Sequence, residues 1–152
     1  MAEIQIEVKG LKELRARFAK MPSKYNAAMR KTMEASLFVL QENVPPYPPP
    51  PSGSTYRRTG TVGRSLGVGM AGRPVGQPDI KKVTGRVGSN FVGTFGTRLN
   101  YAPYVIGERE QARAHKGRWW TMLTIAKNAT PKIIQVFEAL TVELARFLDS
   151  GR

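Results

Sequence analysis

The order of patterns along the 152 residues predicts an α+β fold. An alternating strand comes first, a long helical pattern follows, glycine-rich strands occupy the middle, and helices return at the end. Strands followed by helices are typical of a small antiparallel sheet with helices packed on one face. The length suits a single domain over residues 1–152, and a composition of 41% hydrophobic and 23% charged residues is globular. We therefore expect a long N-terminal helix and a C-terminal helix on one face of the sheet, with extended proline-rich and glycine-rich loops.

The first expected element is a half-buried strand at residues 3–8. Charged or polar residues alternate there with apolar ones, and this period of two is typical of strands. The strand ends before Gly10. Its apolar positions, which share one face, are Ile4, Ile6 and Val8.

Helices are expected between Gly10 and Pro45. Apolar residues recur there every three or four positions, as they do on one face of a helix. Pro22 interrupts the pattern and suits the first turn of a second helix, where a missing N–H costs nothing. We predict a short helix at 11–20 and a longer one at about 22–43, which ends ahead of Pro45. The methionines of this face are expected to fill the core, namely Met21, Met29 and Met33.

Residues 45–58 form a proline-rich arm. Six prolines between positions 45 and 51 have no N–H and a fixed φ, so they favour an extended polyproline II segment over helix or inner strand. Tyr56, Arg57 and Arg58 follow. A stiff arm of this kind between two ordered regions suits docking between proteins rather than catalysis.

The middle of the chain, rich in glycine, valine and threonine, is expected to hold the remaining strands. A tight turn at Ser89-Asn90 would join two of them. Residues 72–80, which include Pro74 and Pro78, are expected to form a mobile loop. The predicted strands are Ser65–Ala71, Lys82–Gly88, Phe91–Arg98 and Tyr101–Ile106.

The last third returns to a helical pattern. A short helix is expected at Trp120–Lys127, and Thr130 then reads as the N-cap of a second helix with Pro131 at its first position. Ser150-Gly151 marks the expected end. The apolar stripe of this helix comprises Ile133, Phe137, Leu140, Leu144 and either Phe147 or Leu148.

Charge is concentrated in the middle of the chain. The formal net charge is +13, and residues 51–119 hold 12 Lys or Arg against 3 Asp or Glu. Such a segment attracts anions, so an acidic protein partner, nucleic acid and a merely solvated surface all remain possible interpretations. The absence of cysteine excludes disulfides and thiolate metal sites, and with one histidine we expect neither metal nor cofactor. No apolar run is long enough to cross a membrane, so a soluble protein is expected.

Two short motifs resemble enzyme signatures and are interpreted as accidental. Residues 63–67 match G-x-S-x-G around Ser65, with Asp79 and His115 following in hydrolase order, but glycines after the serine disfavour the helix that this motif requires. Residues 67–72 match G-x-G-x-x-G without a following helix, so these glycines are expected to serve turns or close packing. His115 is expected to be a solvated loop residue.

Aromatic residues interleaved with arginine indicate recognition instead. This composition is typical of protein–protein hot spots and also of nucleic-acid sites. Of the neighbouring Trp119 and Trp120, one is expected in the core and the other covering it. The candidate interface residues are Tyr47, Tyr56, Arg57, Arg58, Arg64, Arg73, Tyr101, Tyr104, Arg118 and Trp119.

Three segments carry a resemblance to a known family. They are Gly10-Leu11-Lys12-Glu13-Leu14 at the start of the helical region, Thr59-Gly60-Thr61-Val62-Gly63-Arg64-Ser65, and Gly96-Thr97-Arg98-Leu99-Asn100-Tyr101-Ala102-Pro103-Tyr104-Val105. In these segments the chain resembles the tail-completion or minor tail proteins of long-tailed, lambda-like phages. The last segment is the most specific of the three.

The resemblance implies a structural virion protein that is not an enzyme. Such a protein joins head and tail at the neck, as a homo-oligomeric ring, expected to be a hexamer, between the head connector and the tail tube. It would assemble in the host cytoplasm and contact the connector or stopper and the terminator or tube proteins, with passing contact to phage DNA and none to membrane. The alternatives are a tail terminator that caps the tube, a basic nucleic-acid-binding protein, and a small hydrolase acting through Ser65.

Overall fold

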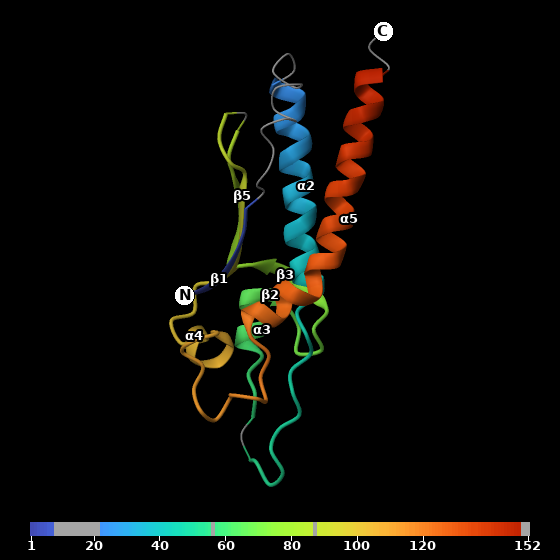
Figure 1. Ribbon diagram of the computed structural model, residues 1–152. Coiled ribbons are helices and arrows are strands. Elements are labelled where there is room, and N and C mark those ends of the chain that lie inside the picture. The colour runs from blue at the N-terminus through green and yellow to red at the C-terminus, as the bar shows by residue number, and fades with distance from the viewer. Residues whose placement is uncertain (8–21, 56, 87, 150–152) are drawn as a thin grey trace.

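Two long helices and a three-stranded sheet form the upper part of the molecule in Figure 1. The computed structural model describes residues 1–7, 22–55, 57–86 and 88–149. β1 (Ala2–Glu7), β4 (Ile80–Thr84) and β5 (Val92–Thr97) form an antiparallel sheet in the order β1-β5-β4. α2 (Pro22–Glu42) and α5 (Met122–Asp149) pack against each other and against this sheet. The predicted α+β class is therefore confirmed, with both helices on one face.

The alternation seen in the first strand decides which face of the sheet is buried. Ile4 lies opposite Phe95 and Ile6 opposite Gly93, on the side that packs against the core. A Cβ atom at Gly93 would lie 2.9 Å from the Met33 side chain and 3.1 Å from that of Leu37, so α2 approaches closely at this point. The strand predicted at 3–8 is confirmed over residues 3–7 and begins one residue earlier, at Ala2, while Val8 lies outside the described residues.

Helix α2 confirms the longer of the two predicted N-terminal helices. Its bounds, Pro22–Glu42, place the proline in the first turn as expected. The short helix predicted at 11–20 and Met21 lie outside the described residues. The stripe of α2 is buried, and Met29 and Met33 fill the core as predicted; its buried members are Tyr25, Met29, Met33, Leu37 and Leu40.

Helix α5 corrects the prediction of two C-terminal helices, because Met122–Asp149 is continuous and Pro131 lies inside it. Thr130 is therefore not an N-cap; its hydroxyl donates to the Ala126 carbonyl oxygen at 2.7 Å, as in a helix interior. Figure 1 shows the helix bending between its orange start and its red end, as expected for an internal proline. The apolar stripe is buried on both sides of the bend, at Ile125 and at Leu140, so packing outweighs the lost hydrogen bond.

A second, two-stranded sheet lies beside the first. β2 (Leu66–Val68) shortens the strand predicted at Ser65–Ala71, and it pairs with β3 (Pro74–Pro78), within the segment predicted as a mobile loop. Pro74 and Pro78 stand at the two ends of β3. Among the described residues β3 pairs with one strand, β2, so the backbone N–H groups that these prolines lack are not required for pairing along its other edge.

The remaining strand predictions are confirmed for one strand and corrected for two. β5 lies within the predicted Phe91–Arg98, while β4 begins two residues before the predicted Lys82–Gly88. The turn between them is closed by a hydrogen bond from Ser89 N to Arg86 O at 2.9 Å. Tyr101–Ile106 is not a strand: α4 (Ala102–Ile106) is a short helix with Pro103 in its first turn. Another short helix, α3 (Thr61–Ser65), directly precedes β2.

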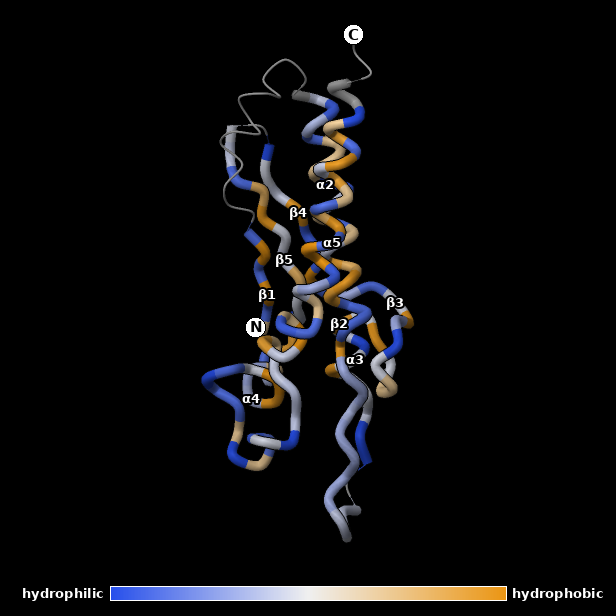
Figure 2. Tube along the Cα trace, turned by 45° about the vertical axis from the view of Figure 1, so that its right-hand side comes forward, coloured by the Kyte–Doolittle hydropathy of each residue, from blue (hydrophilic) through white to orange (hydrophobic). Residues whose placement is uncertain are grey.

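The core is continuous with these small elements. Figure 2 shows hydrophobic residues along the long helices and the sheet, and more hydrophilic ones in the proline-rich loop and beyond α4.

Buried Gln41, near the end of α2, holds the second sheet in place. Its Nε2 donates to Gly67 O at 2.9 Å and to Gly76 O at 2.7 Å. The short helix α3 packs against this second sheet.

Candidate recognition site

The proline arm is extended, and the protein body holds its base. Figure 1 shows it as a loop that reaches away from the helices at the lower end of the molecule. Tyr47 N donates to Met70 O at 2.8 Å, and Trp120 Nε1 donates to Pro46 O at 3.2 Å. Further out, Pro49, Pro50 and Pro51 are exposed. The arm is thus fixed where it leaves the body and open to solvent beyond.

Arg58 ties the returning limb of the arm to the outgoing one. Its Nη1 donates to Pro48 O, and its Nη2 donates to Pro49 O at 3.2 Å. The guanidinium carbon also lies 5.2 Å from the centroid of the Trp119 ring, a cation–π geometry. Arg118 Nη2 adds a donor to Pro49 O at 3.4 Å. Because proline has no N–H, the arm cannot be held by the backbone hydrogen bonds of a sheet. Charged side-chain donors to its backbone carbonyls hold it in one conformation instead.

Aromatic rings gather where the arm meets the body. The centroids of Tyr47 and Trp119 are 4.8 Å apart, and those of His115 and Trp119 are 5.9 Å apart with an edge-on angle of 78°. Trp120, only 8% exposed, belongs to the core, while Trp119 is half-buried over it with ring centroids 5.9 Å apart. The prediction that one tryptophan is core and the other covers it is confirmed. Each such ring pair contributes about 0.5–1.5 kcal/mol beyond its buried area.

The Tyr47 hydroxyl connects this cluster to α3. It accepts a hydrogen bond from Gly63 N at 2.6 Å. Burial raises the pKa of Tyr47 above its ordinary value, and the hydrogen bond from Gly63 N offsets only part of this increase. The phenol therefore stays protonated at neutral pH, and its ring is held as a fixed wall.

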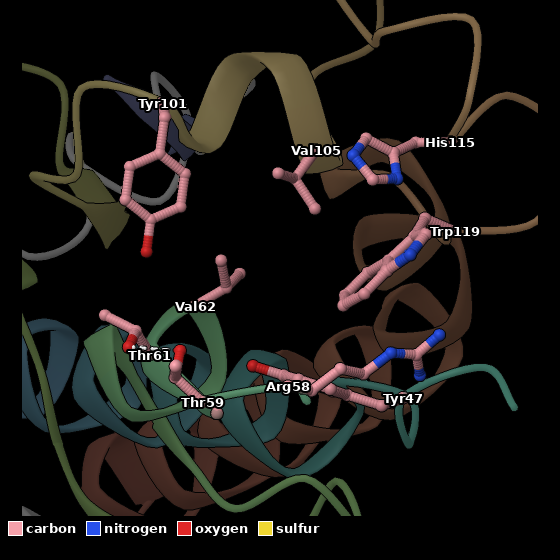
Figure 3. Close-up of a pocket in the computed structure, with 10 residues that line it drawn as sticks. Tyr47, Arg58, Thr59, Thr61, Val62, Tyr101, Val105, His115 and Trp119 are labelled. Carbon is pink, nitrogen blue, oxygen red and sulfur yellow. Dashed lines mark hydrogen bonds between the residues drawn. The ribbon is translucent and has the colours of Figure 1, made fainter. Parts of the chain in front are cut away.

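These rings border a cavity of about 280 Å³ that is open to solvent on one side. Figure 3 shows the rings of Tyr101 and Trp119 on opposite sides of it. Four segments far apart in the sequence contribute: the outgoing limb of the arm, the returning limb with α3, α4 with the residue before it, and the 115–119 region. The lining residues are Tyr47, Arg58, Thr59, Gly60, Thr61, Val62, Tyr101, Val105, His115 and Trp119.

The structure brings together four of the ten residues proposed for the interface from sequence, namely Tyr47, Arg58, Tyr101 and Trp119. Arg118 contacts the arm, and Arg64 lies at 3.4 Å from the Thr61 hydroxyl. Exposed Tyr104 is on α4, exposed Arg57 precedes Arg58, and exposed Arg73 lies in the turn between β2 and β3, apart from the cavity lining. Tyr56 lies outside the described residues.

Sequence reasoning missed several members of the lining, among them His115. It was expected in solvent, but the half-buried ring packs edge-on against Trp119. Trp119 N donates to His115 O at 2.9 Å, so a helical turn joins them. The four-residue spacing was the available signal, because residues four apart in a helical turn share a face.

Ser65 of the G-x-S-x-G motif and Asp79 form hydrogen bonds with other groups of the fold rather than with each other. Ser65 is 7% exposed, and its hydroxyl donates to Val62 O at 2.8 Å. Ser65 is the last residue of the short helix α3, and the strand β2 follows it, which reverses the order that a nucleophile elbow requires. The Asp79 carboxylate accepts hydrogen bonds from Thr97 Oγ1 at 3.3 Å and from Arg98 N at 3.1 Å.

The glycines of the G-x-G-x-x-G motif have steric roles. Gly67 and Gly72 have φ of +75° and +76°, and a Cβ at Gly72 would lie 2.6 Å from Val44 O. A strand, β3, follows the motif. The interpretation of these glycines as turn and packing residues is confirmed.

Within the described ranges, no three His, Asp or Glu side chains gather as a metal site. None of the helices in this part of the chain is both long and apolar enough to cross a membrane. Comparison of the chain with protein-family models, with curated proteins and with solved structures found no match.

Proposed function

We propose that this chain is a structural protein of a phage neck, which completes the tail and joins it to the head as a ring between connector and tail tube. The proposal is carried by where the segments that resemble tail-completion proteins lie in the structure. Two of the three segments that resemble tail-completion proteins, 59–65 and 96–105, line the same cavity: Thr61 and Val62 come from one, Tyr101 and Val105 from the other. The family resemblance thus converges on one local structure rather than on scattered positions.

The arm and the cavity suit contacts in a ring. Each subunit of a ring presents two different surfaces, one to each neighbour. Here a fixed arm extends from the body, Tyr101 in the cavity beside it is 41% exposed, and Tyr104 on α4 is 57% exposed. Exposed tyrosines beside arginines are the composition of interface hot spots.

A nucleic-acid-binding role is the second candidate, and the charge favours it. Exposed basic residues lie on the arm, at Arg57, and in the segment after α4, at Arg109, Arg113 and Lys116. Phosphate contacts would make affinity for duplex DNA fall steeply with salt. Titration of the purified protein with duplex DNA at several salt concentrations tests this role; no binding at physiological salt removes it.

The experiment that tests the neck role is disruption of the gene in the phage that encodes it, followed by electron microscopy of the lysate. The proposal predicts filled heads and tails of normal length that fail to join. Overlong tail tubes would instead identify a tail terminator, and normal yields of infectious particles would refute both structural roles.

Complementation of that mutant then tests the arm. Replacement of Pro49, Pro50 and Pro51 by serine preserves the backbone carbonyls that Arg58 and Arg118 bind, but it removes the stiffness of the segment. We expect few joined particles. The matched control, Ser52→Ala with Thr55→Ala on the same arm, is expected to restore joining. Joined particles in normal number from the triple serine variant would exclude a role for the arm.

A further inference from the structure

The cavity beside the arm has walls suited to a proline-rich segment. Tyr47 and Trp119 form one side and Tyr101 the other, as Figure 3 shows. Proline-rich segments in the polyproline II conformation dock in aromatic-lined grooves, where the rings of prolines lie against the aromatic faces.

The size of the cavity favours side chains over a free small molecule. Its volume of about 280 Å³ lies just below the range of roughly 300–1,000 Å³ that is usual for small-molecule sites. One or two protein side chains match such a space. An occupant that arrives already rigid also loses little conformational entropy on binding.

This chain itself carries a segment of the matching chemistry. Pro49, Pro50 and Pro51 are exposed on the arm, and donors from Arg58 and Arg118 to the Pro49 carbonyl hold this segment in place. The rigid, apolar tip and the open aromatic cavity are thus two complementary surfaces of one molecule.

The two surfaces do not meet within one copy. Arg58 both lines the cavity and holds the Pro48 and Pro49 carbonyls, so the arm leaves from the rim of its own cavity. Figures 1 and 2 show the arm extending away from the body. A turn back into the cavity would break the contacts that fix the arm. A second copy has no such obstacle.

We propose that the exposed prolines 49–51 of one copy dock in the aromatic cavity of a second copy. This inference rests on the proposed ring, to which it adds the contact between neighbours. The contact joins two different surfaces. Repetition of such a contact closes a ring when the rotation between neighbouring subunits is a whole fraction of a full turn. Each subunit would thereby donate one arm and receive another.

The test uses a synthetic peptide of residues 45–55 as the probe. Binding to the purified protein is measured by calorimetry and by the fluorescence of Trp119, which lines the cavity while Trp120 is buried. We expect saturable binding with a fluorescence change. The same peptide with serine at positions 49, 50 and 51 should bind at least about 10-fold more weakly, equal to about 1.4 kcal/mol.

Variants of the protein locate the site. Tyr101→Ala removes one wall, and Thr61→Arg fills the space; each should raise the dissociation constant of the peptide by about 10-fold or more. Val142→Ala, at a 50% exposed apolar position on α5, is the matched control and should change nothing. Absence of binding at millimolar peptide overturns the inference, and so does equal binding to all three variants.

The inference and the proposed function can fail separately. If the peptide binds but disruption of the gene leaves heads and tails joined normally, the docking contact stands and the neck role is refuted. A joining defect without peptide binding would leave the neck role and remove this contact.

Discussion

Substitution of Gly67 by alanine should destabilise the protein strongly, and the reason is visible at the second sheet. Gly67 lies in β2 with φ of +75°, a left-handed conformation that side chains disfavour. An added Cβ would lie 2.5 Å from Gln41 Nε2, 2.7 Å from Gly76 O and 2.8 Å from Pro78 N. Two of these three atoms belong to the backbone of β3 and cannot turn aside.

Two terms set the expected magnitude. Left-handed backbone costs a residue with a Cβ roughly 1–2 kcal/mol, and a methyl group forced into packed surroundings costs about 1–3 kcal/mol. The free energy of unfolding should therefore fall by about 2–5 kcal/mol. For a chain of this size each kcal/mol shifts Tm by about 2–4 °C, so Tm should fall by about 4–20 °C.

Chemical denaturation and thermal melting followed by circular dichroism measure this loss. Gly76→Ala is the matched control on the partner strand, because a Cβ there meets no atom of the described residues within 4 Å. That variant should stay within about 0.5 kcal/mol of the parent protein. Equal stability of the two variants would refute the steric interpretation of Gly67 and reopen the question of why the glycine-rich motif is there.

Three further predictions concern single residues. Thr130→Ala should leave stability unchanged or raise it by up to about 0.5 kcal/mol in denaturant titrations, since Thr130 lies inside α5; an N-cap would lose about 1 kcal/mol. Tyr47→Phe should remove part of the stability loss that the protein shows at alkaline pH. Because the pKa of Tyr47 is raised in the folded protein, its protonated phenol stabilises the fold fully below the unfolded pKa of 10.0, and this stabilisation is lost as pH rises through the folded pKa. Thermal melts at increasing pH measure the difference between the variant and the parent protein. Gln41→Leu should cost about 1–3 kcal/mol in the same denaturant titrations, because it leaves the buried Gly67 carbonyl without its donor.

Elements with a strong period could be predicted from the sequence. β1 and α2 were located to within one residue at most of their described ends, because one face of each packs into the core and fixes the pattern. Proline was misinterpreted at one position and not taken into account at another. Pro131 suggested a new helix, although burial on both sides of it keeps α5 continuous. Residues 101–106 have strand-forming side chains, but Pro103 presets the first turn of α4.

The candidate site could be predicted in composition but not in arrangement. The pairing of aromatic residues with arginines pointed to Tyr47, Arg58, Tyr101 and Trp119, which the fold then brought to one cavity. Nothing local in the sequence showed that α3 and α4 face each other across it. That juxtaposition depends on long-range packing, which patterns of neighbouring residues do not encode.

If the proline arm is an assembly contact, its exposed prolines become inaccessible to a reagent in solution when particles assemble. The chain has no cysteine, so Pro50→Cys gives a single reactive thiol on the exposed part of the arm. Maleimide labelling rates are compared between the isolated protein and assembled particles that contain the variant, with denatured particles as the control for total thiol. We predict labelling at least about 10-fold slower in intact particles than in the isolated protein, a protection of about 1.4 kcal/mol. Equal rates in both would show that the arm stays in solvent after assembly, and therefore that it is not an assembly contact.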